Sequence, residues 1–198
     1  MRKTSLVLLS MMVLGMCATI ANAQGTGIYF SGNLGGIRVM DSDVTWYDGF
    51  QDEAKFDTGI VTTVAIGWDF GIGLRPEFEL GFRFNEVDRQ FPNGIGGEIY
   101  SSSIMGNLFF DFIPHQRVSP FIGAGVGFAN VEVDLDFWGS DDDTVFAYQF
   151  MAGLSFAVSR NINIDLQYRY FATEDPEFDF FESEYKTHSV MGGIRIRF

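Results

Sequence analysis

The sequence predicts an all-β protein, an eight-stranded antiparallel β-barrel of up-and-down topology that spans a membrane. Bulky apolar residues alternate with small or polar residues along eight segments of the chain, which is the period expected of β-strands. Phe is unusually abundant, at 22 of 198 residues. The connections between the segments alternate between short and long. This layout, with an even number of strands, is typical of outer-membrane barrels.

The overall composition limits the classes of protein that need to be considered. A chain of 198 residues is long enough for one domain, and its hydrophobic content of 46% argues against a disordered protein. Asp and Glu number 26 against 13 Lys and Arg, which gives a net charge of −13. Because a phosphate backbone attracts basic surfaces, we expect no nucleic-acid partner.

The N-terminus is organised like a secretory signal peptide. Arg2 and Lys3 precede an apolar run over Leu6–Met16, and the small residues Ala21-Asn22-Ala23 form a cleavage site. We therefore predict that residues 1–23 are removed and that residues 24–198 form the barrel domain. The apolar run is short for a membrane anchor, and the bulky residue before Cys17 disfavours a lipoprotein site there. Cleavage also removes Cys17, the only cysteine, so we expect no disulfide in the mature chain.

The alternation is clearest over Leu74–Asn85, where one face is apolar and the other carries Arg, Glu, Gly and Asn. Five further segments repeat this pattern, at residues 60–70, 100–112, 146–158, 162–170 and 190–198. Two others, 28–39 and 120–136, begin regularly and then shift their apolar positions by one residue, to Ile37 in the first and Val131 in the second. A shift of this kind is what a β-bulge produces.

The connections give the barrel its two ends. Short connections are predicted at residues 71–73, 113–119 and 159–161, and longer ones at 40–57, 88–97, 137–144 and 173–184. Both chain ends then lie on the side of the short turns, which faces the periplasm in outer-membrane barrels.

The volume of the apolar residues decides which face of the barrel points outward. A soluble, lipocalin-like barrel would hold the apolar stripe inside. The interior of an eight-stranded barrel is just wide enough for side chains to fill, and the large residues of the six regular segments would overfill it. The opposite stripes hold mainly small and polar residues, so we expect the bulky stripe to face lipid.

Charged residues of both signs lie on the stripe that is predicted to face inward. Buried charges are costly unless they are paired and hydrogen-bonded, so we predict a salt-bridge network that fills the lumen. A filled lumen implies no general diffusion pore, because porins need more strands for an aqueous channel. The predicted network consists of Arg75, Glu77, Glu79, Arg83, Asp111, Asp165, Arg169, Arg195 and Arg197.

The chain end resembles the sorting signal that is read by the outer-membrane barrel assembly machinery. Gly193, Ile196 and the terminal Phe198 match the glycine and the two hydrophobic positions of that signal, whereas Met191 departs from it because a polar residue is usual there. The mature chain as a whole resembles the small OmpA-like barrels, including opacity-protein-type surface antigens and porin family proteins. The segments that carry this resemblance are residues 74–81, 120–128 and 187–189 with the final strand.

The resemblance implies an integral protein of the bacterial cell outer membrane. Its expected partners are outer-membrane lipid and lipopolysaccharide, the barrel assembly machinery, and a host or surface ligand. We expect a monomer. Shared fold patterns of this kind support location better than biochemical role.

The sequence offers little that could serve catalysis or hold a cofactor. His115 lies in a turn, and His188 precedes Ser189, but adjacent strand residues point to opposite faces and cannot form a dyad. The glycines of Gly123–Gly127 alternate on a strand, so they indicate close packing rather than a nucleotide site. We therefore expect no enzyme activity, no cofactor and no metal; a lipid A-modifying enzyme and a narrow channel remain the alternatives.

The long connections are strongly acidic. Clustered carboxylates can bind divalent cations, but solvated loops that stay soluble by repulsion are the more common case. The expected function is therefore structural and surface-exposed, with adhesion or antigen-like contacts through these loops. The acidic residues are Asp41, Asp43, Asp48, Asp52, Glu53 and Asp57 in the first loop, Asp141–Asp143 in the third, and Glu174, Asp175, Glu177, Asp179, Glu182 and Glu184 in the fourth.

Overall fold

The computed structural model describes residues 26–39, 42–46, 51–54, 58–87, 97–114, 116–135, 139–174, 181–182 and 186–198. Within these ranges no helix has the length and hydropathy to cross a membrane. The predicted signal peptide, residues 1–23, lies outside them.

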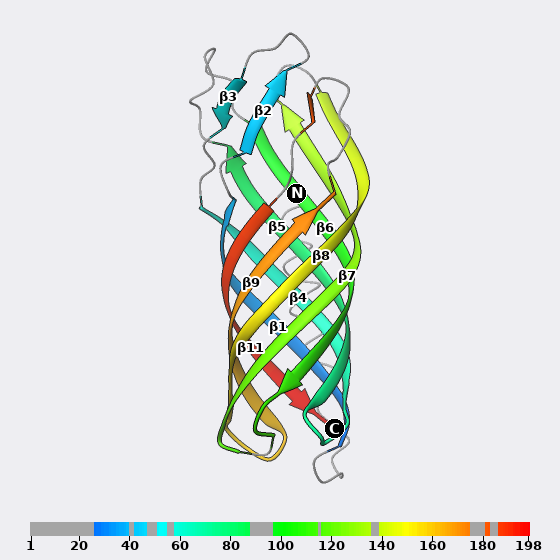
Figure 1. The fold of residues 1–198 in the computed structure, drawn as a ribbon, viewed down its shortest axis with the longest axis vertical. Coiled ribbons are helices and arrows are strands. Elements are labelled where there is room, and N and C mark those ends of the chain that lie inside the picture. The colour runs from blue at the N-terminus through cyan, green and yellow to red at the C-terminus, as the bar shows by residue number, and fades with distance from the viewer. Residues whose placement is uncertain are drawn as a thin grey trace, which may run out of the picture.

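Eight strands form a closed antiparallel barrel (Figure 1), which confirms the predicted fold class. Around the barrel the order is β1-β11-β9-β8-β7-β6-β5-β4, so each strand pairs with its neighbours in sequence and β1 closes the barrel against β11. The strands are β1 (Gly27–Val39), β4 (Thr58–Asp69), β5 (Leu74–Val87), β6 (Gly97–Asp111), β7 (Val118–Leu135), β8 (Gly139–Ala157), β9 (Ile162–Thr173) and β11 (Lys186–Arg197).

Three short strands form a second sheet at the end of the barrel that carries the long loops. β2 (Ser42–Trp46) pairs with β3 (Gln51–Ala54) and with β10 (Phe181–Glu182). The sequence predicted only loops in these regions. Because β2 and β3 belong to the first loop and β10 to the fourth, this sheet joins two loops that are far apart in sequence (Figure 1).

The predicted β-bulges in β1 and β7 are wrong. β1 keeps an unbroken register with β4 from Gly27 to Arg38, and β7 keeps one with β8 along its whole length. Ile37 and Val131 therefore point into the barrel, where they are 1% and 2% exposed. The apolar pattern shifts because these two inward positions carry apolar residues, not because a residue is inserted.

The third connection is shorter than predicted. The sequence predicts a loop over residues 137–144, but β8 begins at Gly139 and its ladder with β7 continues to the pair Leu135–Gly139. The three acidic residues of this region, Asp141–Asp143, are therefore strand residues. β7 and β8 are the longest strands of the barrel, with 18 and 19 residues.

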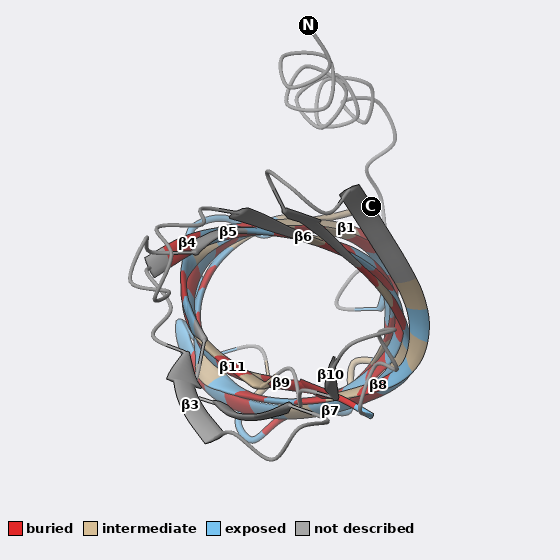
Figure 2. Ribbon diagram, turned by 90° about the horizontal axis from the view of Figure 1, so that it is seen from above, coloured by how far each residue is buried: buried red, intermediate tan, exposed pale blue. Residues whose placement is uncertain are grey.

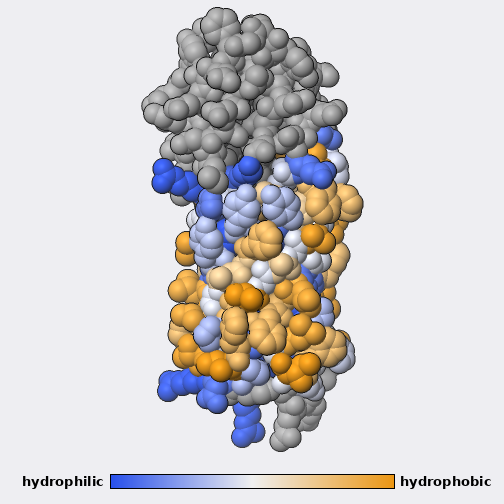
Figure 3. Space-filling model, in the orientation of Figure 1, coloured by the Kyte–Doolittle hydropathy of each residue, from blue (hydrophilic) through white to orange (hydrophobic). Residues whose placement is uncertain are grey.

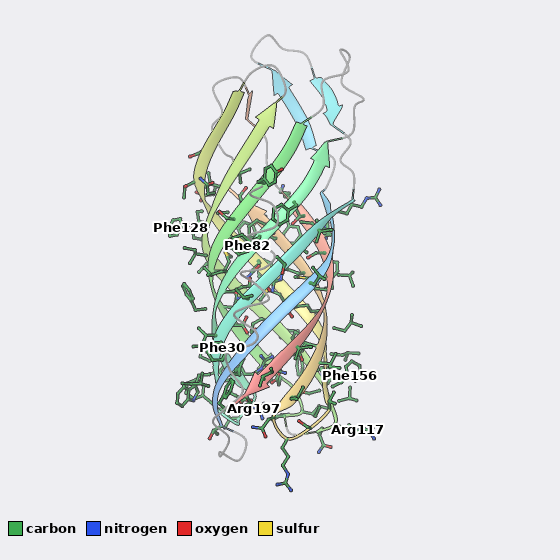
Figure 4. All side chains as sticks on the ribbon, turned by 180° about the vertical axis from the view of Figure 1, so that it is seen from behind. Phe30, Phe82, Arg117, Phe128, Phe156 and Arg197 are labelled. Atoms are coloured by element: carbon green, nitrogen blue, oxygen red, sulfur yellow. The ribbon has the colours of Figure 1, made fainter. Side chains whose placement is uncertain are left out.

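The bulky stripe faces outward, as the volume argument predicts. Phe150 and Ile194 are 57% and 45% exposed, whereas Arg83 and Asp165 are buried. Labelled Phe128 and Phe156 project from the outer wall in Figure 4, and Figure 3 shows an apolar band with hydrophilic residues at both of its margins. Seen along the axis, buried and exposed residues alternate around the wall (Figure 2). This arrangement rules out the lipocalin-like alternative.

The turn between β4 and β5 is short because glycine allows a conformation that other residues rarely adopt. Gly71 and Gly73 have φ angles of 75° and 92°. The backbone N–H of Gly71 donates to the Asp69 carboxylate over 2.8 Å, which closes the turn. Residues 71–73 thus form the short connection that the sequence predicted.

Candidate functional site

The lumen contains a layer of charged and polar side chains toward the short-turn end. Arg75 donates two hydrogen bonds to the Asp111 carboxylate, of 2.8 and 2.9 Å, and a third to the Tyr29 hydroxyl over 3.3 Å. The Tyr29 hydroxyl in turn donates to Glu77 over 3.0 Å, as Ser31 does over 3.2 Å. Strands β1, β5 and β6 therefore share one polar network across the barrel.

Arg195 and Arg197 of the last strand extend this layer. Arg195 donates to Ser155 over 2.7 Å and to Asp165 over 3.2 Å. Arg197 and Asp69 form an ion pair of 2.6 Å that is partly accessible to solvent. These contacts tie β11 to β4, β8 and β9, on both sides of the strand.

A second charged layer lies one step further into the barrel. The two terminal nitrogens of the Arg169 guanidinium, Nη1 and Nη2, donate to the Glu79 carboxylate over 2.7 and 2.8 Å. Gln149 donates to Glu79 over 3.1 Å and to Asn107 over 2.7 Å. Glu79 and Gln149 are completely buried and Arg169 is 1% exposed. This layer spans the lumen from β5 to β9, and its side chains are buried.

Arg83 is the next charged residue after Glu79 on the lumen side of β5. Its guanidinium donates to Ser103 over 2.9 Å and lies 3.5 Å above the centre of the Phe171 ring, a favourable cation–π distance. All nine residues of the predicted charge network thus carry side chains on the lumen side, and Arg197 is the most accessible of them.

The lumen also contains apolar side chains that the sequence prediction missed. Three clusters of buried residues line it, and Tyr29 is buried beside them. The clusters are Ile37, Val61 and Met191; Met105, Ala129, Ala147 and Phe171; and Phe109, Phe121 and Met151. The lumen is therefore a mixed core, in which the Arg75 guanidinium lies over the Phe109 ring and the Arg83 guanidinium over the Phe171 ring.

Glycines make room for the large lumen residues. Phe109 pairs directly with Gly123, Asn107 with Gly125 and Met105 with Gly127. A Cβ atom on Gly123 would lie 2.5 Å from Cδ1 of Phe109, closer than real Cβ atoms approach. This geometry supports the close-packing interpretation of Gly123–Gly127. The pairing of a large inward residue with a cross-strand glycine is the sequence signal that could have identified the apolar lumen residues.

The outer wall carries a cluster of rings near the loop end of β9 and β11. The Tyr168 hydroxyl and Nδ1 of His188 share a hydrogen bond, and the Tyr170 ring lies 5.2 Å from the His188 ring. His188 is on the outer face whereas Ser189 is 5% exposed on the lumen side. The two adjacent residues therefore do not meet, as predicted. His115 lies outside the described residues.

The last strand completes the barrel at the short-turn end. The Phe198 N–H donates to the carbonyl oxygen of Ile28 over 3.0 Å, and its ring packs edge-on against Phe30 with centroids 5.6 Å apart. Ile196 lies on the outer face and Gly193 faces the Asn33 side chain. Met191, which departs from the sorting signal, is fully buried in the lumen with Ile37 and Val61.

The acidic loop residues are only partly within the described chain. Asp43, Asp52, Glu53 and Glu182 belong to strands of the small sheet, in which Asp43 pairs with Glu53. Asp41, Asp48, Asp57, Asp175, Glu177, Asp179 and Glu184 lie outside the described residues. Within the described ranges, no group of three or more His, Cys, Asp or Glu side chains is arranged to hold a metal ion.

A closed barrel with an apolar outer wall and a charged, filled lumen defines the class of integral outer-membrane β-barrel proteins. Residues 6–198 match the outer membrane protein beta-barrel domain family, and the chain belongs to that family. Its location is the bacterial outer membrane.

Individual relatives are more distant. The chain is 25% identical over 177 residues to the putative adhesin RC1281 of Rickettsia conorii, a match that covers 75% of this chain and 71% of that protein. The fold is similar to Neisserial surface protein A, with a TM-score of 0.62, 19% identity and coverage of 87% of this chain and 97% of the other. The fold is also similar to that of Ail of Yersinia pestis, which was solved in complex with the heparin analogue sucrose octasulfate. That match has a TM-score of 0.52 and 16% identity, and it covers 86% of this chain and 99% of the Ail chain.

Proposed function

We propose that this chain is a non-enzymatic, surface-exposed outer-membrane barrel whose acidic loops make adhesive contacts with a basic partner surface. The observation that carries this proposal is the small sheet of β2, β3 and β10, which joins the first and fourth loops into one structured platform. A binding surface needs such order, because loops that must order on binding lose affinity.

The chemistry of the platform indicates a basic partner. Asp43 and Glu53 occupy directly paired positions of β2 and β3, so the register places two acidic residues next to each other in this sheet. Acidic residues attract a cationic partner. The adhesin name of the Rickettsia relative supports an adhesive role. Ail was solved with a polyanion, but the net charge of −13 in this chain argues for a ligand of the opposite sign.

The same proposal includes the remaining partners and the signal peptide. Residues 1–23 direct export and are removed, and the assembly machinery reads Gly193, Ile196 and Phe198. The barrel then resides as a monomer among lipid and lipopolysaccharide. The lumen layer of Glu79, Arg169 and Gln149 weighs against a channel, since its side chains are inaccessible to water. The separation of His188 from Ser189 weighs against the hydrolase alternative.

Attachment of cells that display the protein tests this proposal. We expect display to increase attachment to polylysine-coated surfaces and to cultured host-cell monolayers, and not to heparin-coated ones. The substitutions Asp43→Asn, Asp52→Asn, Glu53→Gln and Glu182→Gln together should abolish the gain. Arg160→Gln, in a short turn at the other end of the barrel, is the control and should leave attachment unchanged. Undiminished attachment of the quadruple variant, or a changed lipid A mass profile in displaying cells, would contradict the proposal.

A further inference from the structure

The basic side chains of the described residues fall into three groups. One lines the lumen and consists of Arg75, Arg83, Arg169, Arg195 and Arg197. A second, Arg117 and Arg160, lies exposed in the short turns, where Figure 4 labels Arg117. The remaining two, Arg38 and Lys186, lie on the outer wall, at the loop ends of β1 and β11. These two strands are neighbours, so the outward-facing cations of the described wall occur together rather than scattered around the barrel.

His188 lies between these two cations. It pairs directly with Arg38 across the β1–β11 ladder, and it follows Lys186 by two residues on the same face of β11. Residues at directly paired positions have Cβ atoms about 4.5–5.5 Å apart. Arg38, Lys186 and His188 therefore occupy outward positions in one small area of the wall, which we call the basic cluster.

Aromatic rings extend the basic cluster sideways along the wall. Tyr168 is hydrogen-bonded to His188, and the rings of Tyr170 and Tyr148 continue the contact to β8, with centroids 6.4 Å apart. Ala172 has an outward position in this row and is nevertheless completely buried, so large neighbours cover the wall here. Tyr is enriched where a barrel meets the membrane–water interface.

The basic cluster lies at the margin between the apolar band and the acidic loop end. Below it on the same strands, Val190 and Leu166 are 59% and 49% exposed, and Gly36 leaves open space beneath Arg38. Toward the loops, the next outward position after Ala172 is the exposed Glu174, one residue past the end of β9. The cluster thus faces sideways into the headgroup region of the leaflet on the long-loop side, which in outer-membrane barrels is the outer leaflet.

We propose that the basic cluster of Arg38, Lys186 and His188, with Tyr168 and Tyr170, is a binding site for the phosphorylated sugar headgroup of an outer-leaflet glycolipid, an inference that rests on the lipopolysaccharide contact of the proposed function. Arg and Lys are the side chains that hold phosphate, Arg through paired N–H donors and Lys as a point charge. The tyrosine rings supply flat faces for the sugar, and the open space at Gly36 admits an acyl chain beside the wall. The chain carries a net charge of −13, so most of the protein repels a lipid phosphate. Two outward cations at the depth of the headgroups supply the local positive charge that attracts one.

Lipid binding to the purified, folded barrel in zwitterionic detergent tests the site. The protein is titrated with bis-phosphorylated lipid A, and the bound fraction is followed by native mass spectrometry. Parallel titrations use dephosphorylated lipid A, phosphatidylglycerol and inorganic phosphate, which distinguish a glycolipid headgroup from other sources of phosphate. The variant is R38Q/K186Q, and R117Q/R160Q is the matched control, because it removes two exposed cations from the opposite end.

Each basic residue near an anionic membrane surface strengthens binding by a factor of about five, so R38Q/K186Q should weaken lipid A binding about twenty-five-fold. R117Q/R160Q should bind like the wild type, and the charge-preserving R38K/K186R should retain binding, which separates loss of charge from loss of fold. Weak binding of dephosphorylated lipid A and of inorganic phosphate is also expected. Unchanged binding by R38Q/K186Q, an equal loss in the control, or equally tight binding of phosphatidylglycerol would overturn the proposal.

Discussion

Breaking the buried Glu79–Arg169 pair should destabilise the barrel more than any change at its surface. In Arg169→Met the carboxylate of Glu79, which is fully buried, loses two hydrogen bonds of 2.7 and 2.8 Å and keeps only the one from Gln149. Each hydrogen bond to a charged group contributes about 1.5–3 kcal/mol, and a buried ion pair that loses one partner costs about 3–5 kcal/mol. We expect Arg169→Met to lower the free energy of unfolding by about 3–5 kcal/mol.

The double variant E79M/R169M provides the decisive comparison. Removing both charges leaves no uncompensated ion, and the remaining losses are two hydrogen bonds of Gln149, the one it donates to Glu79 and the one it accepts from Arg169, each worth about 1 kcal/mol. The double variant should therefore be more stable than Arg169→Met alone. Arg160→Met, in an exposed turn, is the matched control and should change stability by less than about 0.5 kcal/mol.

The assay is denaturant unfolding of the barrel refolded in lipid vesicles, with linear extrapolation to zero denaturant. A double-variant cycle then gives the coupling energy between the two residues. If the costs of Glu79→Met and Arg169→Met simply add in the double variant, the two side chains are independent and the reasoning is refuted.

Three further outcomes follow from the packing and topology. Gly123→Ala should lower the free energy of unfolding by about 1–3 kcal/mol, because the added Cβ would meet the Phe109 ring. Gly36→Ala is the control and should cost almost nothing, because the space around Gly36 is open. Equal costs for the two variants would contradict the packing argument. Deletion of Phe198 removes its contacts to Ile28 and Phe30, so the heat-modifiable folded band in membrane fractions should decrease; an unchanged yield would show that the terminal residue is dispensable. Protease treatment of intact cells should cut only in the long connections, and cleavage within residues 71–73 or 159–161 would reverse the topology.

The strand positions and the outward face could be predicted from the sequence because lipid imposes a strict period-two pattern. Outward residues are mostly apolar over the membrane-spanning length, with exceptions such as Thr62 and Ser102, so the outer stripe is nearly regular. The inward stripe follows no such rule. An apolar residue such as Ile37 or Val131 on that stripe produces the same one-residue shift that a bulge would produce. Only the cross-strand register, which the structure supplies, separates the two interpretations.

The charged members of the lumen network could also be predicted, because a charged residue on the stripe opposite the lipid face must point into the lumen. Their partners could not be assigned. Glu79 and Arg169 are 90 residues apart in sequence, and their contact depends on the order of strands around the barrel. The basic cluster was missed for the same reason, since Arg38 and Lys186 become neighbours only when β1 closes against β11.

The lumen leaves little freedom for a function inside the barrel. Large inward residues lie opposite cross-strand glycines, as Tyr29 does with Gly67 and Phe109 with Gly123. The volume of each of these side chains is therefore accommodated by the missing side chain of its paired glycine. An interior matched in this way resists added side chains, because movement of one side chain requires its paired strand to move as well. Specific recognition is therefore expected at the two surfaces that remain variable, namely the joined loops at the end of the barrel and the outer wall beside the lipid headgroups.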